Sequence, residues 1–273
     1  MNTLIQILLT LLLTGLTPIF AQNDNQQLIV PLSDPSKPGT LEVGLVNGFI
    51  HVVGHTGKDV IIDVSSFEGR QRARNDDQNA SGMRRISPNN GLDVTAEERN
   101  NRVKIDASSH VRPVNLTIKV PQRFGLKLST VNNGDITVEN VTGELEINNV
   151  NGPIELNNVG GSAVANTING NLKATFRDLS ANAPMAFSTL NGRVDVTFPA
   201  NAKANIKLKS DRGEVYSDFD INIDKSQPKT TKSNQTGMYR VSIEDWIYGK
   251  INGGGPEVMM KSMQGNIYVR KAK

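Results

Sequence analysis

Residues 134–174 read GDITVENVT-GELEINNVN-GPIELNNVG-GSAVANTIN-GNLKA, so a glycine begins each nine-residue unit. Within a unit aliphatic and polar residues alternate, as Ile154, Glu155 and Leu156 do. Glycine tolerates the backbone angles of a turn, and the alternation places aliphatic side chains on one face of a strand and polar ones on the other. One unit cannot bury its apolar face alone, whereas stacked units can. The repeat therefore predicts an all-β protein built as a β-solenoid, or β-helix, of stacked strand repeats.

The length of one coil follows from the charges. With nine residues per coil Glu146 would stack directly on Glu155, which is unfavourable. With eighteen, Thr137, Glu155 and Lys173 share a column, so that an acid lies beside a base. We therefore expect about eighteen to twenty-two residues and two turns per coil, with Ile154 pointing inward. An antiparallel β meander is the alternative, because Asn-Gly also favours tight hairpins.

Strand-like alternation extends on both sides of this repeat. It begins at Leu41, and weaker copies of the repeat unit lie at 46–52 and 263–269. Residues 22–40 are polar and contain several prolines, which is typical of a linker. Residues 69–90 have no apolar periodicity, which indicates a long mobile loop. We expect a single β-repeat domain over residues 41–273, preceded by the linker 22–40 and interrupted by the loop.

Residues 1–21 have the pattern of a signal peptide. The segment Leu4–Leu16 is almost entirely apolar, and Pro18 and Ala21 then supply a helix break and a small residue for cleavage. We expect an exported protein that is periplasmic, at the outer surface or secreted. An uncleaved membrane anchor is the alternative. No later segment is apolar enough to cross a bilayer, so we expect no transmembrane span in the mature chain.

Several kinds of functional site are absent from the sequence. Without cysteine the chain has no disulfide, no thiolate metal site, no Cys nucleophile and no lipid on Cys. It contains neither a Gly-x-Ser-x-Gly elbow nor a Walker loop, and no Asp recurs as calcium-binding β-rolls require. His51 and His55 lie on strand and turn rather than on one helix face. We expect no catalytic residue, no metal and no cofactor.

Glu144 and Glu146 are the strongest candidates for a catalytic pair. Glycosidic catalysis needs two carboxyl groups roughly 5–10 Å apart, and alternate polar positions of one strand could be that close. Solvated strand faces usually show the same pattern, however, and aromatic residues that could bind sugars make up only 5% of the chain. A carbohydrate-active β-helix enzyme acting on polysaccharide is therefore the alternative function.

One basic cluster in the loop is a candidate binding surface. It could attract cell-surface polysaccharide, another envelope component or a protein partner, although a solvated loop has the same composition. The cluster consists of Arg70, Arg72, Arg74, Arg84 and Arg85. The net charge of +3 is small for 273 residues, and we expect no nucleic-acid partner.

Five segments together carry a family resemblance. They are a strand ending in Val-Pro at 114–121, the strand 126–130, the glycine series, and the segments 249–256 and 265–271. In these the chain resembles the bacterial putative-adhesin domain family of unknown function, whose members contain β-strand repeats. The resemblance implies a β-solenoid-like fold outside the cytoplasm and supplies no catalytic residues. The expected function is that of an exported, non-enzymatic, adhesin-like interaction module of the cell envelope or surface.

Overall fold

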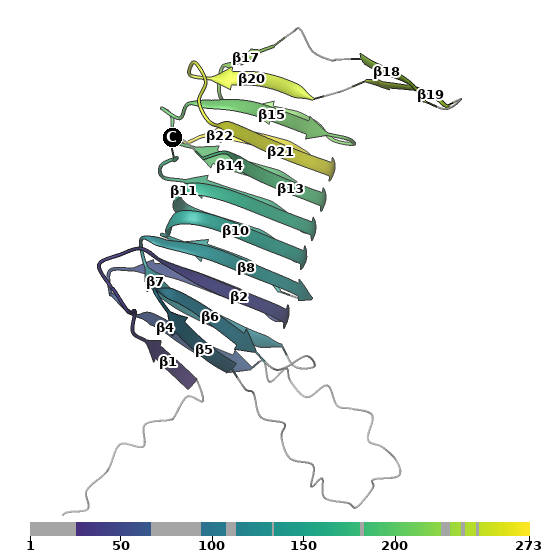
Figure 1. Ribbon diagram of the computed structural model, residues 1–273. Coiled ribbons are helices and arrows are strands. Elements are labelled where there is room, and N and C mark those ends of the chain that lie inside the picture. The colour runs from purple at the N-terminus through teal and green to yellow at the C-terminus, as the bar shows by residue number, and fades with distance from the viewer. Residues whose placement is uncertain are drawn as a thin grey trace, which may run out of the picture.

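The computed structural model describes residues 26–66, 94–107, 113–132, 134–180, 183–224, 230–235, 238–243 and 246–273. Within these ranges the regular elements are all β-strands, as the sequence predicts. None of the described residues belongs to a helix that could span a lipid bilayer. Two long sheets run along one axis and enclose the core between them, and one sheet faces the viewer in Figure 1.

We call the sheet nearest the viewer in Figure 1 the front sheet and the other the back sheet. The front sheet contains, in spatial order, β5 (Val94–Arg99), β6 (Arg102–Ala107), β2 (Gly39–Asn47), β8 (Phe124–Asn132), β10 (Thr142–Asn151), the second half of β11 (Ile154–Asn169), β13 (Met185–Asn191), β21 (Glu257–Gln264), β15 (Ala204–Ser210), β20 (Ile247–Ile251) and β17 (Ile221–Ile223).

The back sheet contains, in the same direction, β1 (Gln26–Val30), β4 (Val60–Ser66), β7 (Val114–Pro121), β3 (Ile50–His55), β9 (Ile136–Glu139), the first half of β11, β12 (Leu172–Phe176), β14 (Val194–Phe198), β22 (Ile267–Lys271) and β16 (Val215–Ser217). Strands β18 (Thr230–Gln235) and β19 (Met238–Ile243) pair only with each other among the described residues.

The register confirms the predicted coil. Ile154 is fully buried and lies opposite Ile136 on one side and Leu172 on the other, eighteen residues away in each direction. The next coil takes twenty-two residues, because Leu172 lies opposite Val194. These pairings are parallel, so the antiparallel meander is wrong for the repeat region. Glu155 lies between its expected neighbours Thr137 and Lys173.

The core consists of aliphatic columns in which each side chain stacks on its register neighbour. Ring contacts are concentrated toward the C-terminal half, where Phe176 lies 5.9 Å from Phe187 and 5.6 Å from Phe198 between ring centroids. Phe187 is the register neighbour of Ala165, so a large side chain stacks beside a small one. Small aliphatic residues in the middle coils therefore leave room for the few aromatic rings that this chain buries.

The recurring glycines stack directly on one another at the turns. An added Cβ at Gly152 would overlap the carbonyl oxygen of Gly134, and one at Gly170 would overlap that of Gly152. Neither of these glycines has a positive φ, whereas Gly48 at one end of the row does, at 119°, as does Gly161 of the nine-residue series, at 95°. The backbone angles of a turn therefore explain only some of the recurring glycines. Close approach between coils is the stronger requirement in the middle of the row.

Buried polar side chains accompany this glycine row. Thr167 is 5% exposed and donates a hydrogen bond from Oγ1 to the carbonyl oxygen of Gly152 in the preceding coil, at 2.9 Å. Five other coils repeat this bond with distances between 2.7 and 3.1 Å. We call the donors the polar column; they are Thr130, Asn149, Thr167, Thr189, Ser262 and Ser210.

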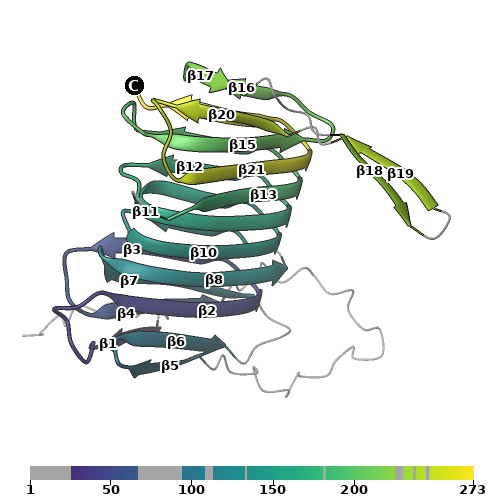
Figure 2. The same ribbon diagram turned by 45° about the horizontal axis from the view of Figure 1, so that its top comes forward.

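Near each end of the domain, one coil lies between two coils that are not its neighbours in the sequence. The coil of β2 and β3 lies between the coil of β6 and β7 and that of β8 and β9. Similarly, β21 and β22 lie between β13–β14 and β15–β16, as Figure 2 shows for β21. Antiparallel strands cover the outer edges, with β4 and β1 beyond β7 and β20 and β17 beyond β15. Strand β1 falls within the range expected to be a linker.

Candidate functional site

Of the candidate residues taken from single motifs, the structure describes the carboxylates and the histidines but not the arginines. The arginine cluster Arg70, Arg72, Arg74, Arg84 and Arg85 lies outside the described residues. Its role as a binding surface stays a prediction.

The carboxylates and histidines have separate partners. Glu144 and Glu146 lie on the outer face of β10, where both line a hollow of about 520 Å³, and Glu146 forms an ion pair with Lys127 at 3.5 Å. His51 lies 3.4 Å from Glu139, whereas His55 binds the carbonyl oxygen of Asp59 at 2.9 Å. Among the described residues, no three His, Asp or Glu side chains gather where they could hold a metal ion.

A row of exposed aliphatic side chains crosses the outer face of the front sheet. The register aligns one such residue at the same position of β2, β8, β10, β11, β13 and β21. Their exposed fractions lie between 38% and 44%, except for one residue that is half-buried. We call this row the aliphatic column; it consists of Val46, Val131, Val150, Ile168, Leu190 and Met263.

Uncharged side chains flank the aliphatic column on both sides. On the turn side, Asn191 donates a hydrogen bond to Asn169 at 2.7 Å, and Asn169 donates to Asn151 at 2.8 Å. Asn151 in turn donates to Asn132 at 3.3 Å, and we call this series of side chains the amide column. The first charged residue in these three rows, counted from β2, is Lys261 on β21. The row on the other side consists of Gly44, Ser129, Asn148, Asn166 and Ser188.

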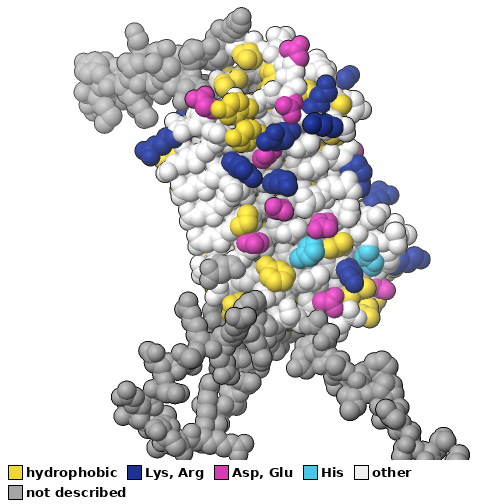
Figure 3. Space-filling view, turned by 180° about the vertical axis from the view of Figure 1, so that it is seen from behind, with side chains coloured by type: hydrophobic (Ala, Val, Ile, Leu, Met, Phe, Trp, Pro, Cys, Tyr) yellow, Lys and Arg dark blue, Asp and Glu magenta, His cyan; other side chains and the backbone are white. Residues whose placement is uncertain are grey.

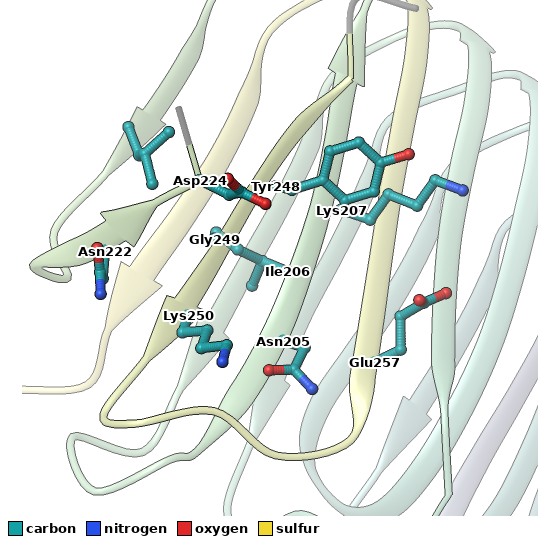
Figure 4. Close-up of a pocket in the computed structure, with 10 residues that line it drawn as sticks. Asn205, Ile206, Lys207, Asn222, Asp224, Tyr248, Gly249, Lys250 and Glu257 are labelled. Atoms are coloured by element: carbon teal, nitrogen blue, oxygen red, sulfur yellow. The ribbon is translucent and has the colours of Figure 1, made fainter. Parts of the chain in front are cut away.

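A groove of about 730 Å³ lies at the C-terminal end of the same face, between β15, β17, β20 and β21 (Figure 4). We call it the terminal groove. Tyr248 and Lys207 are register partners in it, and the Lys207 Nζ lies 5.7 Å from the centroid of the Tyr248 ring. The same Nζ lies 4.7 Å from the ring centroid of Trp246, which directly precedes β20 in the sequence. The amides of Asn205 and Asn222 contribute polar groups to the lining.

The outer face of the back sheet differs in charge. Figure 3 shows Lys and Arg, Asp and Glu, and His side chains spread over it. Arg270 forms two hydrogen bonds with Asp195, at 2.7 and 3.1 Å, and this partner raises the pKa of Arg270 above its usual value. Tyr268 lies between this pair and Tyr216, with 5.3 Å between the ring centroids. The uncharged rows are therefore a property of one face and not of the whole solenoid.

The aliphatic column was missed because its motif position is shared with buried residues. Val141, Val150, Val159 and Ile168 all stand two residues before a glycine of the series. Val141 and Val159 are fully buried, whereas Val150 and Ile168 belong to the exposed row. The eighteen-residue register separates the buried residues from the exposed ones, because it assigns alternate nine-residue units to different turns of the coil.

Comparisons with known proteins add a family and two structures. A family model described as Toastrack DUF4097 matches residues 125–269. A putative cell adhesion protein from Clostridium sporogenes has a similar structure, with a TM-score of 0.46, 13% identity, and coverage of 91% of this chain and 100% of its own. A putative adhesin from Bacteroides fragilis has a TM-score of 0.40 and 13% identity, and the match covers 90% and 96% of the two chains. No curated protein matches the sequence.

Proposed function

The chain belongs to the Toastrack DUF4097 family, whose model matches more than half of it, and we propose that it is an exported, non-enzymatic, adhesin-like interaction module of the cell envelope. It binds its partner through the outer face of the front sheet. Export is supported by the apolar segment Leu4–Leu16 and the cleavage pattern that ends at Ala21.

The aliphatic column is the observation that carries the proposal. Single exposed hydrophobic residues are ordinary on protein surfaces, but a contiguous apolar row marks a surface that binds something. Contact with water does not favour aliphatic side chains, so it does not explain why six successive coils have one at the same outward position. The outward rows of the back sheet carry mixed charges at the same coils.

The surface is also rigid, which favours binding. The aliphatic column lies on strands hydrogen-bonded to neighbours on both sides, and the amide column ties adjacent coils through side-chain bonds of 2.7 and 2.8 Å. A surface already fixed in its bound shape loses little conformational entropy on association. A binding role is therefore better supported than a catalytic one, since the best carboxylate, Glu146, is paired with Lys127 at 3.5 Å.

Two double variants with the same charge change test the proposal. Ile168→Asp with Leu190→Asp places two acids on adjacent coils of the aliphatic column, where the residues are 44% and 41% exposed. Thr175→Asp with Thr197→Asp is the control, because these register partners occupy the same two coils on the back sheet. Both proteins should melt at about the same temperature as each other, because each stacks one pair of acids on adjacent coils. Co-sedimentation with envelope fractions of the producing organism should weaken by about tenfold or more for the first variant only.

Equal binding by both variants would contradict the assignment of this face. Absence of saturable binding by the wild-type protein would contradict the interaction module itself. Fractionation of cells that express the full chain should recover the protein outside the cytoplasm.

A further inference from the structure

We infer that the partner is an uncharged polysaccharide, whose chain lies along the solenoid axis on the front sheet and stacks one sugar ring against Trp246 or Tyr248 at the terminal groove. This inference rests on the proposed function and adds the chemical class of the partner.

The uncharged rows and the terminal groove lie on the same face of the front sheet, with two lysines between them. Ser188 on β13 has Lys261 on β21 as its register neighbour, and Lys261 in turn lies opposite Lys209 on β15. The next outward position, beyond β15, belongs to Trp246, because Leu208 pairs with Ile247. A ligand that follows the columns across the coils therefore passes Lys261 and Lys209, the latter paired with Asp211 at 3.1 Å, and reaches the aromatic rings on the same face of the sheet.

The chemistry of the surface matches that of a sugar chain. A pyranose ring presents an apolar C–H face and a rim of hydroxyl groups, each of which both donates and accepts hydrogen bonds. The aliphatic column and the rings of Trp246 and Tyr248 provide apolar surface for the C–H faces. Amide side chains also both donate and accept, and the amide column supplies them along the whole row beside the aliphatic one.

The charges favour a neutral partner. From β2 to β13 the three rows contain no charged residue, so an acidic polymer would find no cations there and a basic one no carboxylates. The terminal groove balances Lys207 and Lys250 against Asp224 and Glu257. An uncharged chain loses least on leaving water over the rows from β2 to β13, because no charge in them would be buried without a partner.

The shape of the surface favours a linear chain over a folded protein. Strands of adjacent coils lie about 4.8 Å apart, so the six coils of the aliphatic column extend over roughly 24 Å. The column is only one side chain wide. A stable protein interface buries about 800 Å² on each partner, which a narrow row does not supply, whereas an extended polymer needs only length.

Envelope fractions treated in two ways test the inference. Periodate cleaves the vicinal diols of sugars, and a protease removes proteins. Wild-type protein should bind untreated and protease-treated fractions equally and should lose binding after periodate. Soluble neutral glucans should compete for the bound protein at lower concentrations than alginate or hyaluronate does.

Aromatic variants locate the sugar ring. Trp246→Ala should weaken binding by about tenfold, as removal of a buried aromatic anchor commonly does. Tyr216→Ala is the control, because this tyrosine is 51% exposed on the back sheet. Equal binding by the two variants would overturn the assigned ring site.

The remaining outcomes separate the two proposals. Binding that is lost after protease and kept after periodate would identify a protein partner, which overturns the polysaccharide and leaves the interaction module in place. Stronger competition by the acidic polymers would also overturn the neutral class. No binding to untreated fractions would overturn both.

Discussion

Gly125 and Gly152 belong to the same nine-residue series, but only one of them is required by its surroundings. At Gly152 an added Cβ would overlap a backbone atom, the carbonyl oxygen of Gly134. At Gly125 the nearest atom would be the Thr40 hydroxyl oxygen at 3.4 Å, an ordinary contact. Neither glycine has a positive φ, so steric contact alone distinguishes them.

Alanine substitutions should therefore have different effects at these two sites. Gly152→Ala must push two coils apart and should lower the free energy of unfolding by about 1–3 kcal/mol, as overpacking does. Gly125→Ala should change it little or raise it by about 0.4–1 kcal/mol, since alanine restricts the unfolded chain. Urea unfolding of both variants measures the difference. Equal losses would show that the backbone relaxes around an added methyl group or that both glycines serve the turn.

At the scale of the strand, the polar column links each coil to the one before it. Thr167 is inward-facing and almost fully buried, and its hydroxyl satisfies the Gly152 carbonyl oxygen at 2.9 Å. Aliphatic residues fill the other inward positions of this strand, Ala163 and Ala165. The column thus satisfies turn carbonyls that would otherwise be buried without a donor.

Replacement of this hydroxyl by a methyl group should be costly. Thr167→Val keeps the shape but leaves a buried acceptor unpaired, which should lower the free energy of unfolding by about 1–3 kcal/mol. The same substitution at Thr175, on the outer face of β12, should change it by less than about 0.5 kcal/mol. A Thr167→Val protein as stable as wild type would mean that the carbonyl finds another donor.

The local pattern predicts the strands and their register but not the functional surface. The alternation around Ile154 and the charges of Glu155 and Lys173 were sufficient to predict an eighteen-residue coil, because inward packing and cross-strand pairing act between direct neighbours. The aliphatic column could not be predicted because Val150 and Val159 have the same local sequence position. The contact between Trp246 and Lys207 could not be predicted, since Trp246 lies outside the repeat and meets Lys207 only through long-range pairing.

At the scale of the whole molecule, the order of coils along the axis is not their order in the sequence. The segment 263–269 resembles the other repeat units, and nothing in it indicates that β21 lies between β13 and β15. The position depends on long-range pairing of β21 with β13 on one side and with β15 on the other. Both β21 and β22 therefore complete the interior of the stack rather than extend its end.

Removal of the last coil should accordingly disrupt more than one coil. A chain ending at Gly255 lacks β21 and β22, which leaves β13 and β14 unpaired on one side and separates them from β15, β16 and β20. Terminal coils of an ordinary solenoid can be lost with a proportional decrease in stability, because each repeat contacts only its neighbours. Here the cap formed by β15, β17 and β20 would lose its attachment to the rest of the stack. We expect loss of a single cooperative melting transition and protease cleavage throughout residues 204–251.

As a control, replacement of Thr230–Ile243 by a short Gly-Ser linker should leave the transition intact, because β18 and β19 pair only with each other in the part of the chain that the structure describes. A truncated chain that melts cooperatively with only a modest shift would show that β15 can pair directly with β13, and that the interleaved coil adds stability without being needed for assembly.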